Sequence, residues 1–399
     1  MIIGLSTGSF PPITDGVTQV VCNYATWLNN DNDDAYVITP NVPGASYDYP
    51  YEVLTYQSFS VPTRKDYRMG IPALDGAFYR RAKAIPFDMI HAHAPFSSGQ
   101  AALKLARRRD IPLIATFHSK FRDDFKEAVK SDFLADLMLK KVIRFFNQAD
   151  DVWTVSESAI DIMREYGYRG DVYVMGNACD MEPGVRTRES DKLINDRYHI
   201  KEDTPVFMFV GQHVWQKNIK MIIKGLRVLK QEEPNFHMFF VGDGHKRKEA
   251  IAICQRYGLS ENITFTGNIQ EREVLRSLYL RSLAVILPSL YDMSSLVIKE
   301  AAAMHKPMVL VKGSTTAQGV EDQFNGFLVD NTPESLAATL QRAIIHPRLC
   351  EETGENAYKT LYRSWKDTVS LAKERYSTII DRYHTSPSRA QRRQYAQYR

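Results

Sequence analysis

Short apolar segments alternate with amphipathic segments of helical period along the first half of the chain. The apolar runs predict strands at 2–6, 36–39, 89–91, 113–117 and 152–155, with helices between them, for example over 17–28 and 99–109. Apolar strands joined by amphipathic helices form parallel sheets that are covered by helices on each face. The pattern therefore predicts an α/β fold for this half.

The second half of the chain repeats this alternation after a polar stretch. It predicts strands at 206–210, 238–241, 263–265, 283–287, 308–311 and 326–329. A chain of 399 residues is too long for one hydrophobic core. Because 180–202 is polar and has no strong period, we place the domain junction there. The predicted parts are domains over 1–185 and 186–364, a helix over 365–384 and a basic, disordered tail over 385–399.

One further helix is predicted to be long and amphipathic. Apolar residues recur at every fourth position, namely Phe121, Phe125, Val129, Phe133 and Leu137. This spacing places them on one face of a helix, which we expect to span 121–146. That face can pack on its own sheet or contact a lipid surface, and the sequence leaves both alternatives open.

The composition gives no sign of a membrane span or a metal site. No apolar run approaches the roughly 20 residues that a membrane-spanning helix needs. The four cysteines are scattered without metal-binding spacing, as expected for a reduced, cytoplasmic protein. The first residues have the pattern of a strand and carry no basic leader, so we do not expect a signal peptide.

Positive charge is concentrated in two segments of the chain. Residues 64–109 contain ten Lys or Arg and three Asp, a local charge of +7, and the tail adds arginines without an acid. Such segments suit an anionic membrane surface or nucleic acid, or they serve solubility. The candidates for membrane or acceptor contact are Arg64, Lys65, Arg68, Arg107, Arg108 and Arg109. Nucleic acid is not expected as a partner, because aromatic residues are not interleaved with the arginines as stacking platforms.

Two acidic residues eight positions apart form the most informative motif of the sequence. Asp292 falls in a loop after a predicted strand, and Glu300 falls in the helix that follows. Between them, backbone N–H groups near Ser294 and Ser295 point out of a helix N-terminus, which favours an anion. Carboxylates for hydroxyl groups, beside N–H donors for phosphate, suit a sugar nucleotide.

In each half, the loop after the first strand contains a glycine. Gly16 opens a helix, where its backbone can approach a phosphate, although Asp15 or Thr14 can also simply cap that helix. The loop lacks the G-x-G-x-x-G spacing of a dinucleotide site. In the second half, Lys217 stands after Gly211 where a helix begins, and a cation there can neutralise a leaving diphosphate.

A histidine ends the strand that is predicted at 113–117. Ligands of open α/β sheets bind at the carboxyl ends of strands, so His118 can meet a ligand, and a structural role remains the alternative. His91 and His93 flank the end of an earlier strand and can reach the same edge. They could pair on a metal, but no third ligand stands at a suitable spacing, so no metal is expected.

These motifs carry a resemblance that covers nearly the whole chain. The stretch from Asp292 to Glu300 with Ala301 and Ala302 after it, and the segment 325–329, resemble the large family of retaining GT-B glycosyltransferases. The segments 64–68, 91–96 and 116–119 resemble its lipid-glycosylating branch, which includes phosphatidylinositol mannosyltransferases and bacterial diacylglycerol glucosyltransferases. The resemblance implies two Rossmann-like domains facing across a cleft, the first for the acceptor and the second for the sugar nucleotide. It also implies that the C-terminal helix crosses back to the first domain.

The same resemblance implies roles for single residues. Glu300 would hold the ribose hydroxyls, and Lys217 would contact the phosphates. Asp292 and His118 would contact the donor sugar, His118 close to its reacting carbon. The other donor-binding positions that it implies are Gly16, Gln212, Ser294, Ser295 and Leu296. At two positions the chain departs from the family, which usually has arginine at Gln212 and glutamate at Asp292, so the leaving-group site lacks one positive charge.

The activity implied is transfer of a hexose, glucose or galactose, from a nucleotide sugar, UDP-linked by expectation, to a hydroxyl of a membrane lipid such as diacylglycerol or ceramide. The resemblance implies retention of configuration and neither metal nor cofactor. The basic segment and the amphipathic helix suggest a cytoplasmic protein that is peripheral at the inner face of the plasma membrane. A soluble sugar or polysaccharide precursor is the alternative acceptor, and a sugar-nucleotide epimerase is a rival of the same fold class. Because of Gln212, a non-catalytic sugar-nucleotide-binding protein is a further alternative.

Overall fold

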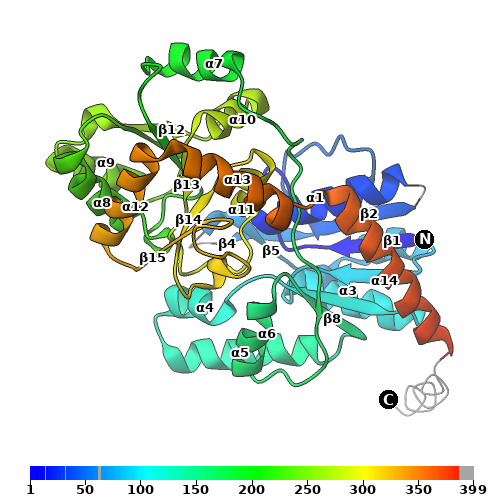
Figure 1. Cartoon of the computed structure of the whole chain (residues 1–399). Helices are drawn as coiled ribbons and strands as arrows, with labels where there is room; N and C mark the ends of the chain where they lie inside the picture. The colour runs from blue at the N-terminus through cyan, green and yellow to red at the C-terminus, as the bar shows by residue number, and fades with distance from the viewer. Residues whose placement is uncertain (14, 32, 62–63, 386–399) are drawn as a thin grey trace. The chain divides into compact units, whose positions relative to one another are not determined.

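The structure is a computed structural model that describes residues 1–385 except 14, 32 and 62–63, and the predicted tail thus lies outside the described residues from 386 onward. The chain divides into two compact units (Figure 1). The first comprises Met1–Asn177 with Trp365–Arg399, and the second comprises Ala178–Ser364. The first unit ends at Asn177, whereas the sequence predicted the junction after residue 185.

The first unit is built on a seven-stranded sheet whose paired strands are all parallel. The spatial order is β3 (Glu52–Tyr56), β2 (Asp34–Pro40), β1 (Ile2–Ser6), β6 (Met89–Ala92), β7 (Leu113–Phe117), β8 (Asp151–Thr154) and β9 (Tyr173–Val174). Its helices include α1 (Gly16–Asn30), α2 (Gly76–Ala84), α3 (Ser97–Arg109) and α6 (Glu157–Glu165), with the short η1 (Pro72–Leu74). All five predicted strands are present, and the edge strands β3 and β9 were missed. Strand order reverses between β1 and β6, which marks the edge where ligands bind in such sheets.

A separate antiparallel pair, β4 (Ser58–Val61) and β5 (Arg64–Gly70), follows β3 in the chain. The basic segment 64–109 therefore begins in a strand. The sequence did not indicate this pair, because its residues are mostly polar and it forms no part of the large sheet.

The prediction of one long helix over 121–146 is wrong. The structure has α4 (Phe121–Val129) and α5 (Asp132–Phe146), separated by Lys130 in the left-handed conformation at a φ of 50°. Ser131 then caps α5 by accepting a hydrogen bond from the Leu134 N–H. The apolar residues consequently do not form one face. The α4 phenylalanines are 6% exposed, whereas Phe133 of α5 is 78% exposed.

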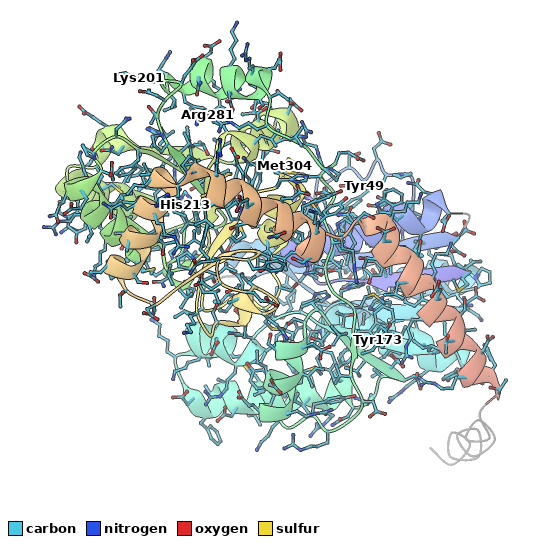
Figure 2. The ribbon with its side chains drawn as sticks, in the orientation of Figure 1. Tyr49, Tyr173, Lys201, His213, Arg281 and Met304 are labelled. Carbon is cyan, nitrogen blue, oxygen red and sulfur yellow. The ribbon has the colours of Figure 1, made fainter. Side chains whose placement is uncertain are left out.

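The C-terminal helix α14 (Trp365–Thr385) belongs to the first unit, as predicted, and packs against α1 (Figure 1). Ion pairs join Lys373 to Asp31 and Asp33, and join Arg375 and Arg382 to Asp151. Arg375 also lies 4.6 Å from the ring centroid of Tyr173, the residue of β9 that Figure 2 labels. Buried contacts complete the attachment, since Trp365 and Tyr376 are each at most 2% exposed.

Tyr376 ties α14 to the carboxyl end of β6. Its hydroxyl lies 2.7 Å from His91 Nδ1, and its ring stacks on Trp153 at 5.3 Å. Replacing Tyr376 by phenylalanine keeps the ring but leaves a buried nitrogen of His91 unpaired. We expect the free energy of unfolding to fall by about 1–3 kcal/mol in urea denaturation. The matched change of the partly exposed Tyr358 to phenylalanine should cost clearly less, and an equal loss in both variants would contradict this role.

The second unit repeats the architecture with a six-stranded sheet, again with all pairs parallel. Its order is β12 (Ile263–Gly267), β11 (His237–Val241), β10 (Val206–Val210), β13 (Ala284–Ile286), β14 (Met308–Val311) and β15 (Phe327–Val329). The helices are α7 (Arg188–Tyr198), α8 (Ile219–Glu232), α9 (Arg247–Arg256), α10 (Arg272–Arg281), α11 (Leu296–Ala303), α12 (Pro333–Ile345) and α13 (Pro347–Leu361), with short turns η2 (Trp215–Lys217), η3 (Ser260–Asn262) and η4 (Thr315–Ala317). All six strands were predicted from their apolar runs. The order reverses between β10 and β13.

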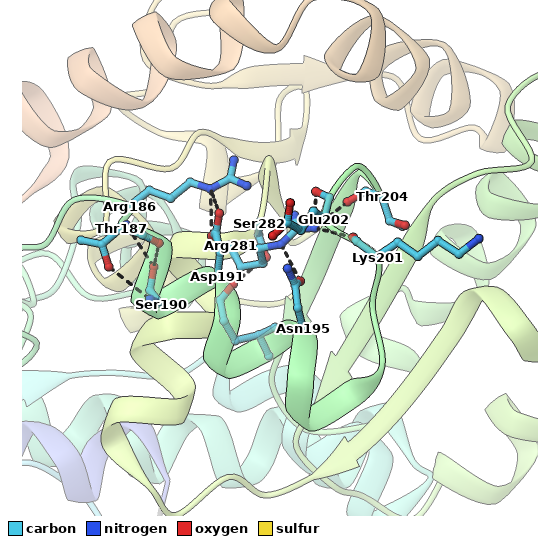
Figure 3. A network of polar contacts seen from close by, with 11 residues as sticks. Arg186, Thr187, Ser190, Asp191, Asn195, Lys201, Glu202, Thr204, Arg281 and Ser282 are labelled. Atoms are coloured by element: carbon cyan, nitrogen blue, oxygen red, sulfur yellow. Dashed lines mark hydrogen bonds and ion pairs between the residues drawn. The ribbon is translucent and has the colours of Figure 1, made fainter.

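The polar stretch at the junction contains helix α7, although its sequence has no strong period. Thr187 and Ser190 form a capping box at its start. Arg281, at the end of α10 and 2% exposed, fastens the far end of α7 (Figure 3). It donates hydrogen bonds to Asn195 Oδ1 and to the carbonyls of Lys201, Glu202 and Thr204. Tertiary hydrogen bonds thus hold a helix that buries little apolar surface of its own.

Candidate functional site

The reversal of strand order in the second unit brings two predicted site residues together. Lys217 ends η2 after β10, and Asp292 lies in the loop after β13. The Lys217 ammonium lies 2.5 Å from one Asp292 oxygen and 2.6 Å from the other. Both side chains remain partly accessible, 17% and 15% exposed. The pair is therefore held in place yet open to a ligand.

The loop that carries Asp292 is fixed by hydroxyl groups. Ser289 Oγ accepts hydrogen bonds from the Tyr291 and Asp292 N–H groups, both at 3.3 Å. Thr315, in the turn after β14, donates its hydroxyl to the Asp292 carbonyl at 2.6 Å. Thr316 donates to the Ser289 carbonyl at 2.8 Å. These hydroxyls hold the carboxylate at the edge of the sheet, and sequence reasoning did not single them out.

Asn218 holds the turn that carries Lys217. It adopts the left-handed conformation at a φ of 60°, which asparagine tolerates better than most residues. Its side-chain amide donates to the Pro288 carbonyl at 3.1 Å and to Asn331 Oδ1 at 2.8 Å. The residue thereby joins the loops after three strands, and its position directly after Lys217 was the only signal in the sequence.

Helix α11 begins beside Asp292 and presents the predicted anion site. Ser295 is its N-cap, and the Ser295 side chain accepts no capping hydrogen bond from the first turn. The first-turn N–H groups are therefore not bonded to the Ser295 side chain, and that of Ile298 donates to the Ser295 carbonyl at 3.2 Å. An anion at this end of the helix would also gain from the helix dipole.

Glu300 lies one turn further along α11. Its Oε2 accepts a hydrogen bond of 2.5 Å from the hydroxyl of Tyr279, a fully buried residue of α10. Burial raises the pKa of Glu300 to about 6. The tyrosine orients the carboxylate and leaves its second oxygen for another donor. The sequence pointed to Glu300 but not to Tyr279.

The loops after β10 and β11 touch through their backbones. A Cβ on Gly242 would lie 2.2 Å from the Gly211 carbonyl oxygen, so only glycine allows this approach. Close packing of the two loops thus explains the glycine at this position. His213, which lies in the loop after β10 and is labelled in Figure 2, is buried. Both of its ring nitrogens are unpaired among the described residues, and burial lowers its pKa to about 4. Gln212 beside it is exposed.

The first unit holds the remaining predicted residues. Gly16 is the first residue of α1, and Asp15 caps that helix by accepting from the Thr18 N–H at 2.8 Å. A Cβ on Gly16 would meet no atom within 4 Å. The protein itself therefore does not require glycine at this position, and the space is compatible with a ligand that approaches the backbone.

Three histidines meet at the ends of β6 and β7. His118 is partly exposed, and its Nε2 lies 3.0 Å from His93 Nδ1. Burial lowers the pKa of His118 to about 4, so its ring is neutral near pH 7. His91 is fully buried and bonded at both nitrogens, to Tyr376 and Thr116. His91 is accordingly a structural residue, whereas His93 contacts the residue that was predicted to bind the ligand.

Comparison with known proteins identifies the family of this chain. Residues 190–360 match the family described as Glycosyl transferases group 1, and residues 14–183 match Glycosyltransferase Family 4. The chain belongs to the group 1 glycosyltransferases. The activity class that the resemblance implied is thereby confirmed.

Relatives in sequence agree with this assignment, and solved structures share the fold. The chain is 22% identical over 384 residues to alpha-monoglucosyldiacylglycerol synthase of Streptococcus pneumoniae, which covers 92% of this chain and 86% of the relative. The enzyme of the same name from Acholeplasma laidlawii is 22% identical, with 87% and 88% covered. Sucrose-phosphate synthase from Thermosynechococcus elongatus has a TM-score of 0.78 at 19% identity, covering 95% and 99% of the two chains. HepE of Anabaena, in complex with UDP-glucose, has a TM-score of 0.74 at 17% identity, covering 94% and 99%. The GT-B fold with two Rossmann-like sheets is thus confirmed.

The predicted basic residues of this glycosyltransferase are largely engaged in local contacts. Arg68 donates to the hydroxyl and carbonyl of Ser58. Arg107 donates to Gln148, and Arg109 donates to two carbonyls at the end of α2. Arg108 lies over the ring of Tyr79. The side chains of Arg64 and Lys65 lie outside what the structure describes, so a membrane role for the whole set stays a prediction.

The described residues show neither a metal-binding cluster nor a membrane-spanning helix. Residues 1–385, apart from the gaps named above, contain no group of three or more His, Cys, Asp or Glu placed to hold a metal ion. Over the same residues, the helices are all too short or too polar to span a bilayer. The metal-free reaction and the peripheral location remain predictions.

Proposed function

We propose that this glycosyltransferase transfers a hexose, glucose or galactose, from a UDP-sugar to a hydroxyl of a membrane lipid such as diacylglycerol or ceramide, with retention of configuration. The observation that carries the proposal is the Lys217–Asp292 pair beside the N-terminus of α11. A cation and helix N–H groups suit a diphosphate, and carboxylates suit sugar and ribose hydroxyls. The names of the relatives support a glucosyl donor and a diacylglycerol acceptor.

The residues of the second unit would act mainly by electrostatics. Donor phosphate oxygens would compete with Asp292 for the Lys217 ammonium and would accept from the first turn of α11. As the bond between the sugar and the leaving oxygen breaks, these groups stabilise the growing negative charge. The acceptor oxygen attacks the same face of the sugar and passes its proton to the departing phosphate. No protein nucleophile is then required, and the residues mainly position the reactants.

The other predicted residues would complete the donor site. Glu300, oriented by Tyr279, would accept hydrogen bonds from the ribose hydroxyls. Gly16 would let the α1 backbone approach the diphosphate, and His118 would contact the donor sugar. No metal or cofactor takes part in this proposal.

A lipid acceptor is supported by the surface of α5. Phe133, Leu134 and Leu137 are 78%, 45% and 47% exposed. The same helix carries the exposed cations Lys140, Lys141 and Arg144. Exposed apolar side chains beside cations suit the boundary of an anionic membrane. We therefore propose that the protein binds the inner face of the plasma membrane peripherally through this helix.

A nucleotide-release assay tests the activity. Each of several UDP-sugars and other nucleotide sugars would be incubated with a diacylglycerol and ceramide mixture, with soluble sugars, or with no acceptor. We expect UDP release that depends on the lipid acceptor, together with an α-linked glycolipid product from an α-linked donor. Release that requires a soluble sugar would favour the alternative acceptor. Donor binding without release on any acceptor would favour a non-catalytic protein, which the exposed Gln212 in place of arginine makes a specific alternative.

Membrane binding has its own expected result. The double change Phe133→Ser and Leu137→Ser removes two exposed apolar groups without touching the predicted donor site. Full burial of an apolar side chain of this size contributes about 1.5–3 kcal/mol. Because the two side chains would insert only partly into the bilayer, the double change should weaken partitioning into vesicles about 10–100-fold. Flotation with vesicles of 30% or zero anionic lipid measures it. The control Ile345→Ser, at a position 55% exposed in the second unit, should bind like the wild type. Equal binding by the double variant would contradict the role of α5.

A further inference from the structure

The contact between His93 and His118 bears on which nitrogen of the His118 ring carries the proton. His93 is 2% exposed, and its Nδ1 lies 3.0 Å from His118 Nε2. Its other nitrogen, Nε2, is buried and has no hydrogen-bond partner among the described residues. Both rings have pKa values lowered by burial, so they are neutral near pH 7 and one must donate to the other.

The unpaired nitrogen decides which ring donates. If His118 donated, His93 would carry its own proton on Nε2, and a buried N–H would be left without an acceptor. If His93 donates from Nδ1, only a lone pair is left unpaired at Nε2. Buried N–H groups without a partner are rarer than acceptors with an unused lone pair. Which nitrogen of a histidine is protonated follows from the bond that the other nitrogen makes.

The ring of His93 is held so that this bond persists. It packs on His91 with ring centroids 4.1 Å apart, and Tyr24 of α1 contacts it edge-on at 5.7 Å. His91 is in turn fixed by Thr116 at 2.6 Å and by Tyr376 of α14 at 2.7 Å. A continuous set of contacts therefore runs from the C-terminal helix to His118.

We propose that His93 is a positioning residue that holds His118 with its proton on Nδ1, so that His118 offers its ligand an N–H donor rather than a lone pair. A hydrogen-bond donor at this position suits an oxygen acceptor, such as a hydroxyl of the donor sugar. Only the identity of that ligand rests on the proposed function, because the tautomer is a property of the free protein.

The tautomer can be read directly by NMR of the full-length protein labelled with ¹⁵N-histidine at pH 7.5. We expect protonated Nδ1 and unprotonated Nε2 for both His118 and His93, assigned with His118→Asn and His93→Asn variants. Protonation of His118 at Nε2 would overturn the proposal. This arm remains decisive if no donor is ever turned over, so failure of the proposed function and failure of this inference are distinguishable.

The kinetics of His93 variants provide a second test of the proposal. His93→Leu removes the N–H group that donates a hydrogen bond to His118, whereas His93→Asn places an amide N–H close to the position of Nδ1. We expect the leucine variant to lower kcat about 5–30-fold, because the hydrogen bond to His118 is lost and His118 Nε2 is left without a partner. The KM for the sugar nucleotide should change less than about threefold. The asparagine variant should recover most of kcat, and the exposed His384→Leu should match the wild type. Equal kcat for both His93 variants, at matched thermal midpoints, would contradict a positioning role.

Discussion

Replacing Lys217 by alanine is expected to lower kcat about 10²–10³-fold, the range found when one preorganised charge-stabilising group is removed from a catalytic site. Lys217 is the cation that the structure places beside Asp292 and the start of α11. In the proposed reaction the leaving diphosphate gains negative charge as the sugar departs. The loss should therefore fall on the chemical step, which single-turnover measurement with saturating donor would report.

A folding defect must be separated from this loss. Without Lys217, the Asp292 carboxylate, only 15% exposed, would lose its partner at 2.5 Å, and the free energy of unfolding should fall. The double variant Lys217→Ala with Asp292→Asn removes the unpaired charge. We expect it to recover stability without recovering turnover. Lys224→Ala, an exposed lysine of α8, controls for the change in net charge. Recovery of kcat in the double variant would contradict a direct role for Lys217.

Replacing Glu300 by glutamine is expected to weaken nucleotide binding about 10–100-fold. The change keeps the shape of the side chain and an oxygen that can accept from the Tyr279 hydroxyl. It removes the negative charge that would strengthen hydrogen bonds from ribose hydroxyls, and a bond to a charged group contributes about 1.5–3 kcal/mol. Calorimetric titration with UDP measures the difference, and the exposed Glu352→Gln provides the matched control.

The pH dependence of this variant gives a sharper test. Burial raises the pKa of Glu300 to about 6, so the wild-type carboxylate is ionised at pH 7.5 and largely protonated at pH 5. UDP affinity of the wild type should fall across that interval, and that of the variant should change less. A pKa raised from 4.5 to about 6 means that the ionised carboxylate destabilises the folded protein as the pH rises above about 4.5. Glutamine carries no charge, so the ligand-free variant should be at least as stable as the wild type at pH 7.5. A variant that is less stable and titrates like the wild type would contradict this account.

Much of the fold could be predicted because its signals are local. The eleven strands predicted in the two sheets are all present, since a strand buried on both faces must be apolar along its length. The motif from Asp292 to Glu300 was visible because one strand, one loop and one helix carry it. Residues that act within a single such unit leave their spacing in the sequence.

The break at Lys130 shows where local patterns mislead. The fourfold spacing from Phe121 to Leu137 continues across the break, but a left-handed lysine and a serine cap end one helix and begin another. A periodic pattern does not record a change of direction of the chain. Phe133 is consequently exposed, although the period placed it on a face with buried Phe121.

By itself, the sequence determined two parallel α/β units, the helix after residue 365 and an acidic motif suited to a sugar nucleotide. Only the tertiary structure decided which groups meet. Lys217 reaches Asp292 across 75 positions of the chain, Tyr279 orients Glu300, and His91 bonds Tyr376 across 285 positions. The physical reason is that hydrophobic period depends on which face of an element is buried, whereas a hydrogen bond between distant residues depends on the order of strands in the sheet. That order brings the ends of β10 and β13 together, and nothing in the spacing of single residues records it.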